Sequence, residues 1–131
     1  MVWQFDLIAG PYEGTTEGPA WDGSGLLFSI LQPSWIMRFD PSNYETVLYR
    51  KDTNCANGLL FDADGTLFAC EGGARRVVFY GRDGTTNVLV DEFDGKRLNI
   101  PNDLAMDNHG RLWFTDPFYE GAGGPWSEDR S

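Results

Sequence analysis

Three segments of the chain follow the same pattern, and this repeat restricts the possible fold more than any other feature. The segments begin at Glu17, Asn57 and Asn102, which are 40 and then 45 residues apart. Each segment has an aspartate at its sixth residue, a glycine at its ninth and Leu-Phe or Leu-Trp at its eleventh and twelfth. These aspartates and glycines are Asp22, Asp62, Asp107, Gly25, Gly65 and Gly110. An interval of this length is typical of the four-stranded blades of a β-propeller.

The local chemistry of each repeat predicts a β-hairpin. An Asp-x-x-Gly stretch favours a tight turn, because the carboxylate accepts backbone N–H groups and glycine tolerates a positive φ. Residues 26–30, apart from Ser29, and residues 112–114 are apolar on consecutive positions, which predicts strands that are buried on both faces. A looser repeat places Val47 and Val88 seven residues after Asp40 and Gly81, which adds two further strands to each unit. Residues 42–57 have no apolar stripe at helical spacing, so we expect strands and a loop there.

The sequence therefore predicts an all-β fold in which residues 1–131 form about two and a half blades of one propeller domain. We expect the chain to end inside its third blade and residues 2–8 to suit pairing with a final blade. Strand edges and an apolar face without partners would then favour association. The aromatic residues are expected to form the core between blades: Trp21, Phe28, Phe61, Phe68, Trp113 and Phe114.

The charge of the chain argues against some classes of partner. The formal net charge is −10, and a field of this sign repels phosphate backbones, so we expect no nucleic-acid binding. No apolar run approaches the roughly 20 residues that span a bilayer, and the first residues lack the pattern of a signal peptide. We therefore expect no membrane contact. The sequence leaves the oligomeric state open.

The two cysteines indicate a reducing compartment. The spacing of Cys55 and Cys70 matches neither a disulfide scaffold nor a zinc site. We expect both to be free thiols, buried or half-buried, in a cytoplasmic protein.

The first residues of the three repeats are candidate metal ligands. In a propeller, equivalent positions of successive blades face the same central region, and here they hold Glu17, Asn57 and Asn102. One carboxylate and two carboxamides supply the hard oxygen ligands that Ca²⁺ prefers, whereas zinc favours His or Cys. The alternative is that Glu17 and Asn57 begin ordinary turns. The sequence leaves both interpretations open.

Several longer stretches resemble one known family. They are Glu17-Gly-Pro-Ala-Trp21, Cys70-Glu-Gly-Gly-Ala-Arg-Arg-Val77, Gly95-Lys-Arg-Leu-Asn-Ile-Pro-Asn-Asp103 and Gly110-Arg-Leu-Trp-Phe-Thr-Asp-Pro117. Together they resemble the gluconolactonase / senescence-marker-protein family, which includes regucalcin. The resemblance extends over nearly the whole chain.

This resemblance implies a six-bladed propeller with one catalytic divalent cation at the mouth of its central channel. The cation is usually Ca²⁺, with Zn²⁺, Mg²⁺ or Mn²⁺ as other candidates. The implied reaction is hydrolysis of a sugar lactone, such as gluconolactone to its aldonic acid. Glu17 matches the first metal-binding glutamate, and Asn102 matches an asparagine that contacts the substrate or the metal. Asn57, Glu71 and Arg75 match recurrent residues near the site, and we expect them to bind the substrate together with Asn102.

The sequence also departs from the family. Ile100 stands where the animal branch has a substrate-binding arginine, so the preferred lactone is open. The resemblance places the remaining metal ligands and the general base beyond Ser131, and Asp103 is a poor substitute because strand neighbours point to opposite faces. We therefore expect no catalytic base among residues 1–131 and no lactonase activity from these residues alone. Detection of Ca²⁺-dependent gluconolactone hydrolysis by the isolated 131 residues would contradict this.

The other charged residues have simpler interpretations. We expect the turn residue His109 to be exposed rather than catalytic. The basic residues Arg75, Arg76, Lys96 and Arg97 form either a substrate clamp or paired surface charges, of which we favour the second. Two other functions stay open: a non-enzymatic propeller that binds calcium or a partner, and an enzyme resembling strictosidine synthase.

Overall fold

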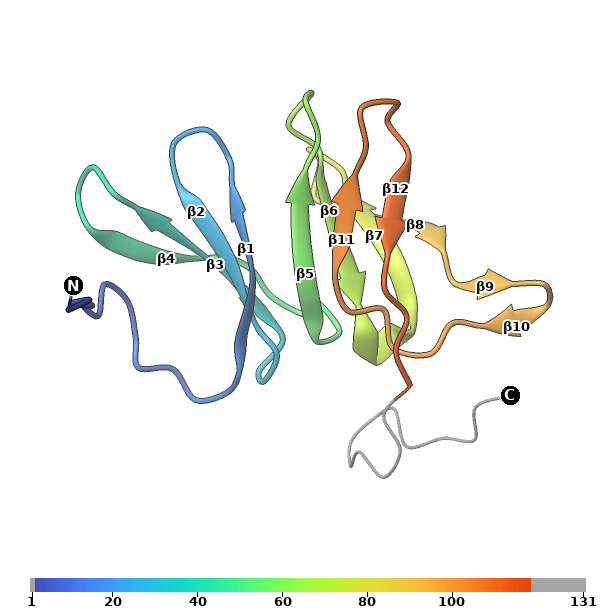
Figure 1. Ribbon diagram of the computed structural model, residues 1–131, viewed down its shortest axis with the longest axis horizontal. Helices are drawn as coiled ribbons and strands as arrows, with labels where there is room; N and C mark the ends of the chain where they lie inside the picture. The colour runs from blue at the N-terminus through green and yellow to red at the C-terminus, as the bar shows by residue number, and fades with distance from the viewer. Residues whose placement is uncertain (1, 119–131) are drawn as a thin grey trace.

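The computed structural model describes residues 2–118, and these residues form an all-β structure (Figure 1). Within this range the only helical segment is one 3₁₀ turn, η1 (Gly72–Ala74). Among the same residues, no helix has the length and apolar character needed to cross a bilayer. The strands are β1 (Thr16–Trp21), β2 (Leu26–Ile30), β3 (Trp35–Asp40), β4 (Glu45–Arg50), β5 (Ala56–Phe61), β6 (Leu67–Glu71), β7 (Arg76–Tyr80), β8 (Thr86–Val90), β9 (Glu92–Phe93), β10 (Lys96–Arg97), β11 (Leu104–Met106) and β12 (Leu112–Phe114).

The strands form two complete four-stranded antiparallel sheets, β1-β2-β3-β4 and β5-β6-β7-β8. Strand order in each sheet follows chain order, as in a propeller blade. The β11-β12 hairpin stands next to the second sheet (Figure 1). Contacts join β1 to β5 and β5 to β11, so the first strands of successive units are neighbours. The predicted unit of four strands is confirmed, and so are the strands and loop expected within residues 42–57.

The aspartates of the repeat form the expected turns. Asp22 Oδ1 accepts hydrogen bonds from the backbone N–H groups of Ser24 and Gly25. Asp62 Oδ1 accepts from residues 64 and 66, and Asp107 Oδ1 accepts from residues 109 and 111. Gly65 and Gly110 have positive φ angles of 78° and 75°, the conformation that glycine provides most easily. The repeat in the sequence is thus a repeat of one hydrogen-bonded turn.

The main core lies between the two four-stranded sheets. Small and branched apolar side chains meet there: Ala20, Leu27, Ile36, Ala56, Leu59, Leu67, Ala69, Val78 and Tyr80. Leu27, Ile36 and Val78 are fully buried. Full burial of one such aliphatic side chain contributes roughly 1.5–3 kcal/mol. This core holds the first strands of the two sheets side by side.

A second core joins the second sheet to the β11-β12 hairpin. It consists of Cys70, Val77 and Leu104, with Leu60, Phe68, Val90, Leu112 and Phe114 packed against it. Phe61 packs against the first core, so the predicted core roles of Phe61, Phe68 and Phe114 are confirmed. Phe28 is half-buried and contacts Tyr12 with 5.7 Å between ring centroids.

Two of the predicted core aromatics are wrong. Trp21 and Trp113 are 55% and 60% exposed, because strand residues alternate between faces. Ala20 takes the core side of β1, so Trp21 faces away from it. Trp113 likewise lies opposite Ala105 on the face that turns away from the second sheet, and its Nε1 donates to Asp107 Oδ2 at 3.1 Å. The strand 112–114 is therefore not buried on both faces.

Two other segments complete the described chain. Residues 2–8 pair with no strand of the described residues, and Val2, Trp3 and Phe5 are largely exposed. A short hairpin of β9 and β10, which the sequence did not predict, projects from the region between the second sheet and β11 (Figure 1).

Candidate functional site

The three repeat-start residues lie on neighbouring strands at one end of the sheets. Glu17 is the second residue of β1, Asn57 is the second residue of β5, and Asn102 lies two residues before β11. These three strands begin at the lower end of Figure 1 and run upward. The structure thus brings Glu17, Asn57 and Asn102 to the same end of the molecule.

Glycines allow the backbones of these strands to approach closely. A Cβ atom at Gly18 would overlap the carbonyl oxygen of Asn57, and φ of Gly18 is +54°. A Cβ atom at Gly58 would lie 2.7 Å from Cα of Asp103 and 2.8 Å from the carbonyl oxygen of Asn102. The Gly58 N–H also donates to that oxygen at 2.7 Å. Asn57 is therefore in the middle of the row, with Glu17 on one side and Asn102 on the other.

The side chains of this row have oxygens available for a ligand. Glu17 is exposed, and Asn57 and Asn102 are half-buried. Within residues 2–118, none of the three side chains forms a hydrogen bond or an ion pair. A carboxylate and two carboxamides that have no partner among the described residues form a donor set that suits a hard divalent cation.

Glu71 lies at the same end of the second sheet, but its carboxylate is engaged. It is 1% exposed and pairs across strands with Ala56. Its oxygens accept hydrogen bonds from Tyr80 Oη at 2.9 Å, from Arg76 Nε at 2.8 Å and from Asn54 Nδ2 at 3.1 Å. Burial, and then the neighbouring Glu71 carboxylate, raise the pKa of Tyr80 far above its usual range, so its hydroxyl stays a donor. Through these hydrogen bonds Glu71 connects β6 to β7 and to the loop before β5.

Arg75 follows η1 and is buried. Its φ of 58° lies in the left-handed region, and its N–H donates to the carbonyl oxygen of Gly72. Its Nε donates to the carbonyl oxygen of Leu98 at 2.5 Å. Arg75 therefore ends the 3₁₀ turn and joins it to the chain that leads to Asn102.

The interpretation of the basic residues as paired surface charges is partly confirmed. Arg76 pairs with Glu71 at 2.7 Å, as that interpretation requires. Arg75 is only 8% exposed, so the description as a surface charge is wrong for this residue. Lys96 and Arg97 are exposed on β10, and Arg97 donates to the carbonyl oxygen of Ala74 at 3.2 Å.

The remaining candidates lie near the row or on turns. Asp103 is exposed, and its Oδ1 accepts from the Leu104 N–H at 2.9 Å. Ile100 is 6% exposed and packs on Gly72, so it belongs to the buried packing around η1. His109 is an exposed turn residue whose backbone N–H donates to Asp107, as expected.

Both cysteines are free, as the sequence predicted. Cys70 is fully buried, and burial together with the charges of Asp103 and Asp116 raises the pKa of its thiol to about 12. Cys55 is half-buried, and its Sγ lies 3.5 Å from Ser34 Oγ. Cys70 therefore stays protonated at neutral pH.

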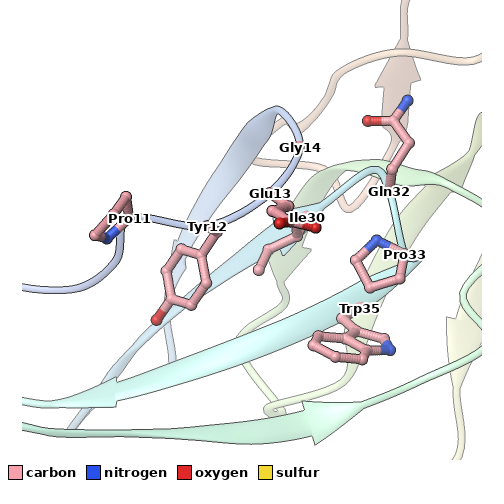
Figure 2. A pocket seen from close by; sticks show the side chains of 8 residues that line it. All are labelled: Pro11, Tyr12, Glu13, Gly14, Ile30, Gln32, Pro33 and Trp35. Atoms are coloured by element: carbon pink, nitrogen blue, oxygen red, sulfur yellow. The ribbon is translucent and has the colours of Figure 1, made fainter.

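Two hollows beside the first sheet were not predicted. The larger, about 660 Å³, is lined by Pro11, Tyr12, Glu13, Gly14, Ile30, Gln32, Pro33 and Trp35 (Figure 2). The smaller, about 330 Å³, includes Glu17 and shares Tyr12 with the larger. Tyr12 therefore lines both the hollow that includes the predicted metal ligand Glu17 and the larger, apolar hollow. No pattern in the sequence distinguishes Tyr12, because its partners come from a distant hairpin.

The fold and this row of residues define a β-propeller protein with a polar site at the start of its inner strands. Residues 15–126 match the family model described as SMP-30/Gluconolactonase/LRE-like region. The chain belongs to this family.

The comparisons with individual proteins agree with this assignment. A curated relative, the gluconolactonase of Zymomonas mobilis, is 33% identical over 122 residues, which covers 79% of this chain and 33% of the relative. The solved structure of a gluconolactonase from Xanthomonas campestris has a TM-score of 0.80 at 32% identity and covers 88% of this chain. Virginiamycin B lyase from Staphylococcus aureus, at 17% identity and a TM-score of 0.60, shares the fold alone.

The chain is short relative to these proteins. It spans 33% of the length of the curated gluconolactonase and 40% of the Xanthomonas structure. The number of blades in the ring therefore stays a prediction.

Proposed function

We propose that this chain provides part of the active site of a Ca²⁺-dependent lactonase that hydrolyses a sugar lactone such as gluconolactone. The observation that supports this proposal is the row of Glu17, Asn57 and Asn102 on adjacent inner strands, with side-chain oxygens that are not engaged within residues 2–118. The similarity to proteins named gluconolactonase gives the chemical class.

The donor set of the row fits the proposed cation. Ca²⁺ takes 6–8 oxygen ligands and accepts carboxylates, amide carbonyls and water. Glu17 and Asn102 are the proposed metal ligands, and no His or Cys lies among the repeat-start residues. Zn²⁺, Mg²⁺ and Mn²⁺ are weaker candidates, of which Zn²⁺ would need nitrogen or sulfur ligands. These two side chains supply too few oxygens for Ca²⁺, so further ligands are proposed to come from residues beyond Ser131.

We assign the substrate contacts to the surroundings of this row. Asn57 and Asn102 are proposed to hydrogen-bond the lactone, because a carboxamide both donates and accepts. Glu71 and Arg75 are buried, and we propose that their hydrogen bonds hold the strands and loops around the row in place. Ile100 is buried against Gly72, so it supplies no cationic group to bind the hydroxyl groups of the lactone.

The chemistry divides between the cation and the chain. When bound, a divalent cation supplies Lewis-acid polarisation of the lactone carbonyl. The Glu17 carboxylate is proposed to hold the positive charge of the cation, and the Asn102 side-chain N–H group is proposed to donate to an oxygen that gains charge. The base that removes a proton from water is proposed to lie beyond Ser131. The free thiols of Cys55 and Cys70 favour a cytoplasmic enzyme.

The test is hydrolysis of gluconolactone by the protein as its gene encodes it, after treatment with a chelator and with Ca²⁺ added back. Glu17→Gln is expected to abolish turnover, because it removes the charged ligand. Glu13→Gln is the matched control, since Glu13 lies in the other hollow and is expected to leave turnover unchanged. Equal activity of wild type and Glu17→Gln would contradict the proposal. Ca²⁺ binding without turnover would instead support the non-enzymatic alternative.

A further inference from the structure

Ser29 has a buried hydroxyl group in the contact between the first two sheets. The residue lies on β2 and is 0% exposed. Its Oγ donates a hydrogen bond to the main-chain carbonyl oxygen of Asn57 at 2.8 Å, across 28 residues of sequence. This bond therefore fixes the backbone of Asn57 in the second sheet against the first sheet.

The same serine is adjacent to Glu17. In the β1-β2 ladder, Ser29 and Glu17 are opposite each other. Gly18 leaves no space between β1 and the Asn57 carbonyl oxygen. That oxygen is thus enclosed between the backbone next to Glu17 and the hydroxyl of Ser29.

A second hydrogen bond continues from Asn57 toward the third unit. The N–H of Gly58, the next residue in the chain, donates to the carbonyl oxygen of Asn102 at 2.7 Å. Two hydrogen bonds therefore connect Ser29, which is opposite Glu17 in the ladder, to Asn57 and the residue after Asn57 to Asn102. A displacement of Asn57 would move it relative to both neighbours.

We propose that Ser29 is a positioning residue of the cation site. It contacts neither cation nor lactone, because its hydroxyl is buried and engaged by Asn57. Its role is to hold the Asn57 backbone in register, so that the oxygens of the row converge on one point. This inference rests on the proposed function.

A different buried hydroxyl provides the comparison for a purely structural role. Thr53 is also 0% exposed, and its Oγ1 has no hydrogen-bond partner among the described residues. Thr53 lies in the loop that connects β4 to β5, and removal of its hydroxyl alters a buried side chain but breaks no bond of the row. Thr53→Val is accordingly the matched control.

The experiment compares Ser29→Ala, Ser29→Cys and Thr53→Val with wild type, in the protein as its gene encodes it. Calorimetric titration with Ca²⁺ alone gives the dissociation constant, and hydrogen exchange without cation gives the protection of the Gly58 amide. Loss of a hydrogen bond of about 1 kcal/mol predicts roughly five- to tenfold weaker Ca²⁺ binding for Ser29→Ala. The weak S–H donor of Ser29→Cys predicts an intermediate loss. Thr53→Val should bind as wild type does.

The outcomes separate this inference from the proposed function. Faster Gly58 exchange and weaker Ca²⁺ binding in Ser29→Ala, but not in Thr53→Val, would support the positioning role. If wild type binds Ca²⁺ and Ser29→Ala binds it equally well, the positioning role is overturned and the cation site stands. If wild type binds no Ca²⁺, the proposed function fails and the inference with it. If Ser29→Ala does not fold, the Ser29→Cys titration decides between the first two outcomes.

Discussion

The backbone of Gly18 packs directly on the carbonyl oxygen of Asn57, so that a Cβ atom at position 18 would overlap this oxygen. This contact sets the distance between β1 and β5, and with it the separation of Glu17 and Asn57 in the row. It also explains why glycine follows Glu17, and the equally close approach of Gly58 to Asn102 and Asp103 explains the glycine that follows Asn57.

Replacement of Gly18 by alanine should therefore destabilise the protein strongly. The added methyl group must displace backbone of another sheet, and overpacking of this kind costs about 1–3 kcal/mol or more. Gly65→Ala is the matched control, because Gly65 also has a positive φ but has open space around it. Urea unfolding should give a larger loss for Gly18→Ala than for Gly65→Ala. Equal losses would show that only backbone strain matters.

Glu71→Gln should cost more stability than the loss of a surface ion pair. The substitution leaves the partly buried Arg76 guanidinium without its anionic partner, and such a loss is expected to cost about 2–3 kcal/mol. Arg111→Gln removes the partner of Asp107 in a pair whose arginine is 66% exposed, and about 0–1 kcal/mol is expected there. Thermal unfolding of the two variants checks the contrast. A small loss of stability in Glu71→Gln would mean that water takes the place of the Glu71 carboxylate beside Arg76.

The free energy of unfolding should decrease in acid, because the turn aspartates Asp22 and Asp107 become protonated. The Arg38 side chain holds the pKa of Asp22 well below 3.8, its ordinary value. Desolvation opposes a similar shift at Asp107, but hydrogen bonds, first that of the Arg111 side chain, bring its pKa to about 2. Because these folded pKa values are depressed, the contribution is present above the ordinary value and is lost as the pH falls toward the folded value.

The urea midpoint should therefore decrease between pH 4 and pH 2 in wild type, and less steeply in Asp22→Asn. Asp64→Asn serves as control, since the Asp64 carboxylate accepts no hydrogen bond from the described residues. A slope that Asp22→Asn leaves unchanged would contradict this assignment.

The two thiols should differ in reactivity. Cys70 is fully buried with a pKa of about 12, so almost no thiolate forms at neutral pH. Cys55 is half-buried and is expected to react first with Ellman's reagent in the native protein. Cys55→Ser should remove the fast phase, whereas Cys70→Ser should keep it. A fast phase that persists in Cys55→Ser would contradict the burial of Cys70.

The sequence predicts the fold well because its signals are local. Asp62 and Gly65 lie within one turn, and the hydrogen bonds that they form join residues no more than four apart in the sequence. The repeat interval then gives the four-stranded unit. The side of a strand that faces the core depends on a neighbouring sheet, so the exposure of Trp21 and Trp113 is not apparent from composition.

The site is predictable only in part, for the same reason. Rotational equivalence of the repeats is enough to bring Glu17, Asn57 and Asn102 to one end. The hydrogen bond from Ser29 to Asn57 and the network around Glu71 connect residues far apart in sequence, and no spacing rule identifies them. The predicted metal and substrate roles stay predictions.

The most direct test of the central claim is the broadening of side-chain amide signals by Mn²⁺ in the ¹⁵N-labelled protein. Mn²⁺ favours the same hard oxygen ligands as Ca²⁺ and is paramagnetic. If Glu17 and Asn102 bind one cation with Asn57 beside it, the amide signals of Asn57 and Asn102 should broaden first, and Glu17→Gln should abolish the effect. Asn87 on β8 should be unaffected at that concentration. Broadening of Asn87 together with Asn57, or of Asn102 without Asn57, would show that the three residues do not share a site.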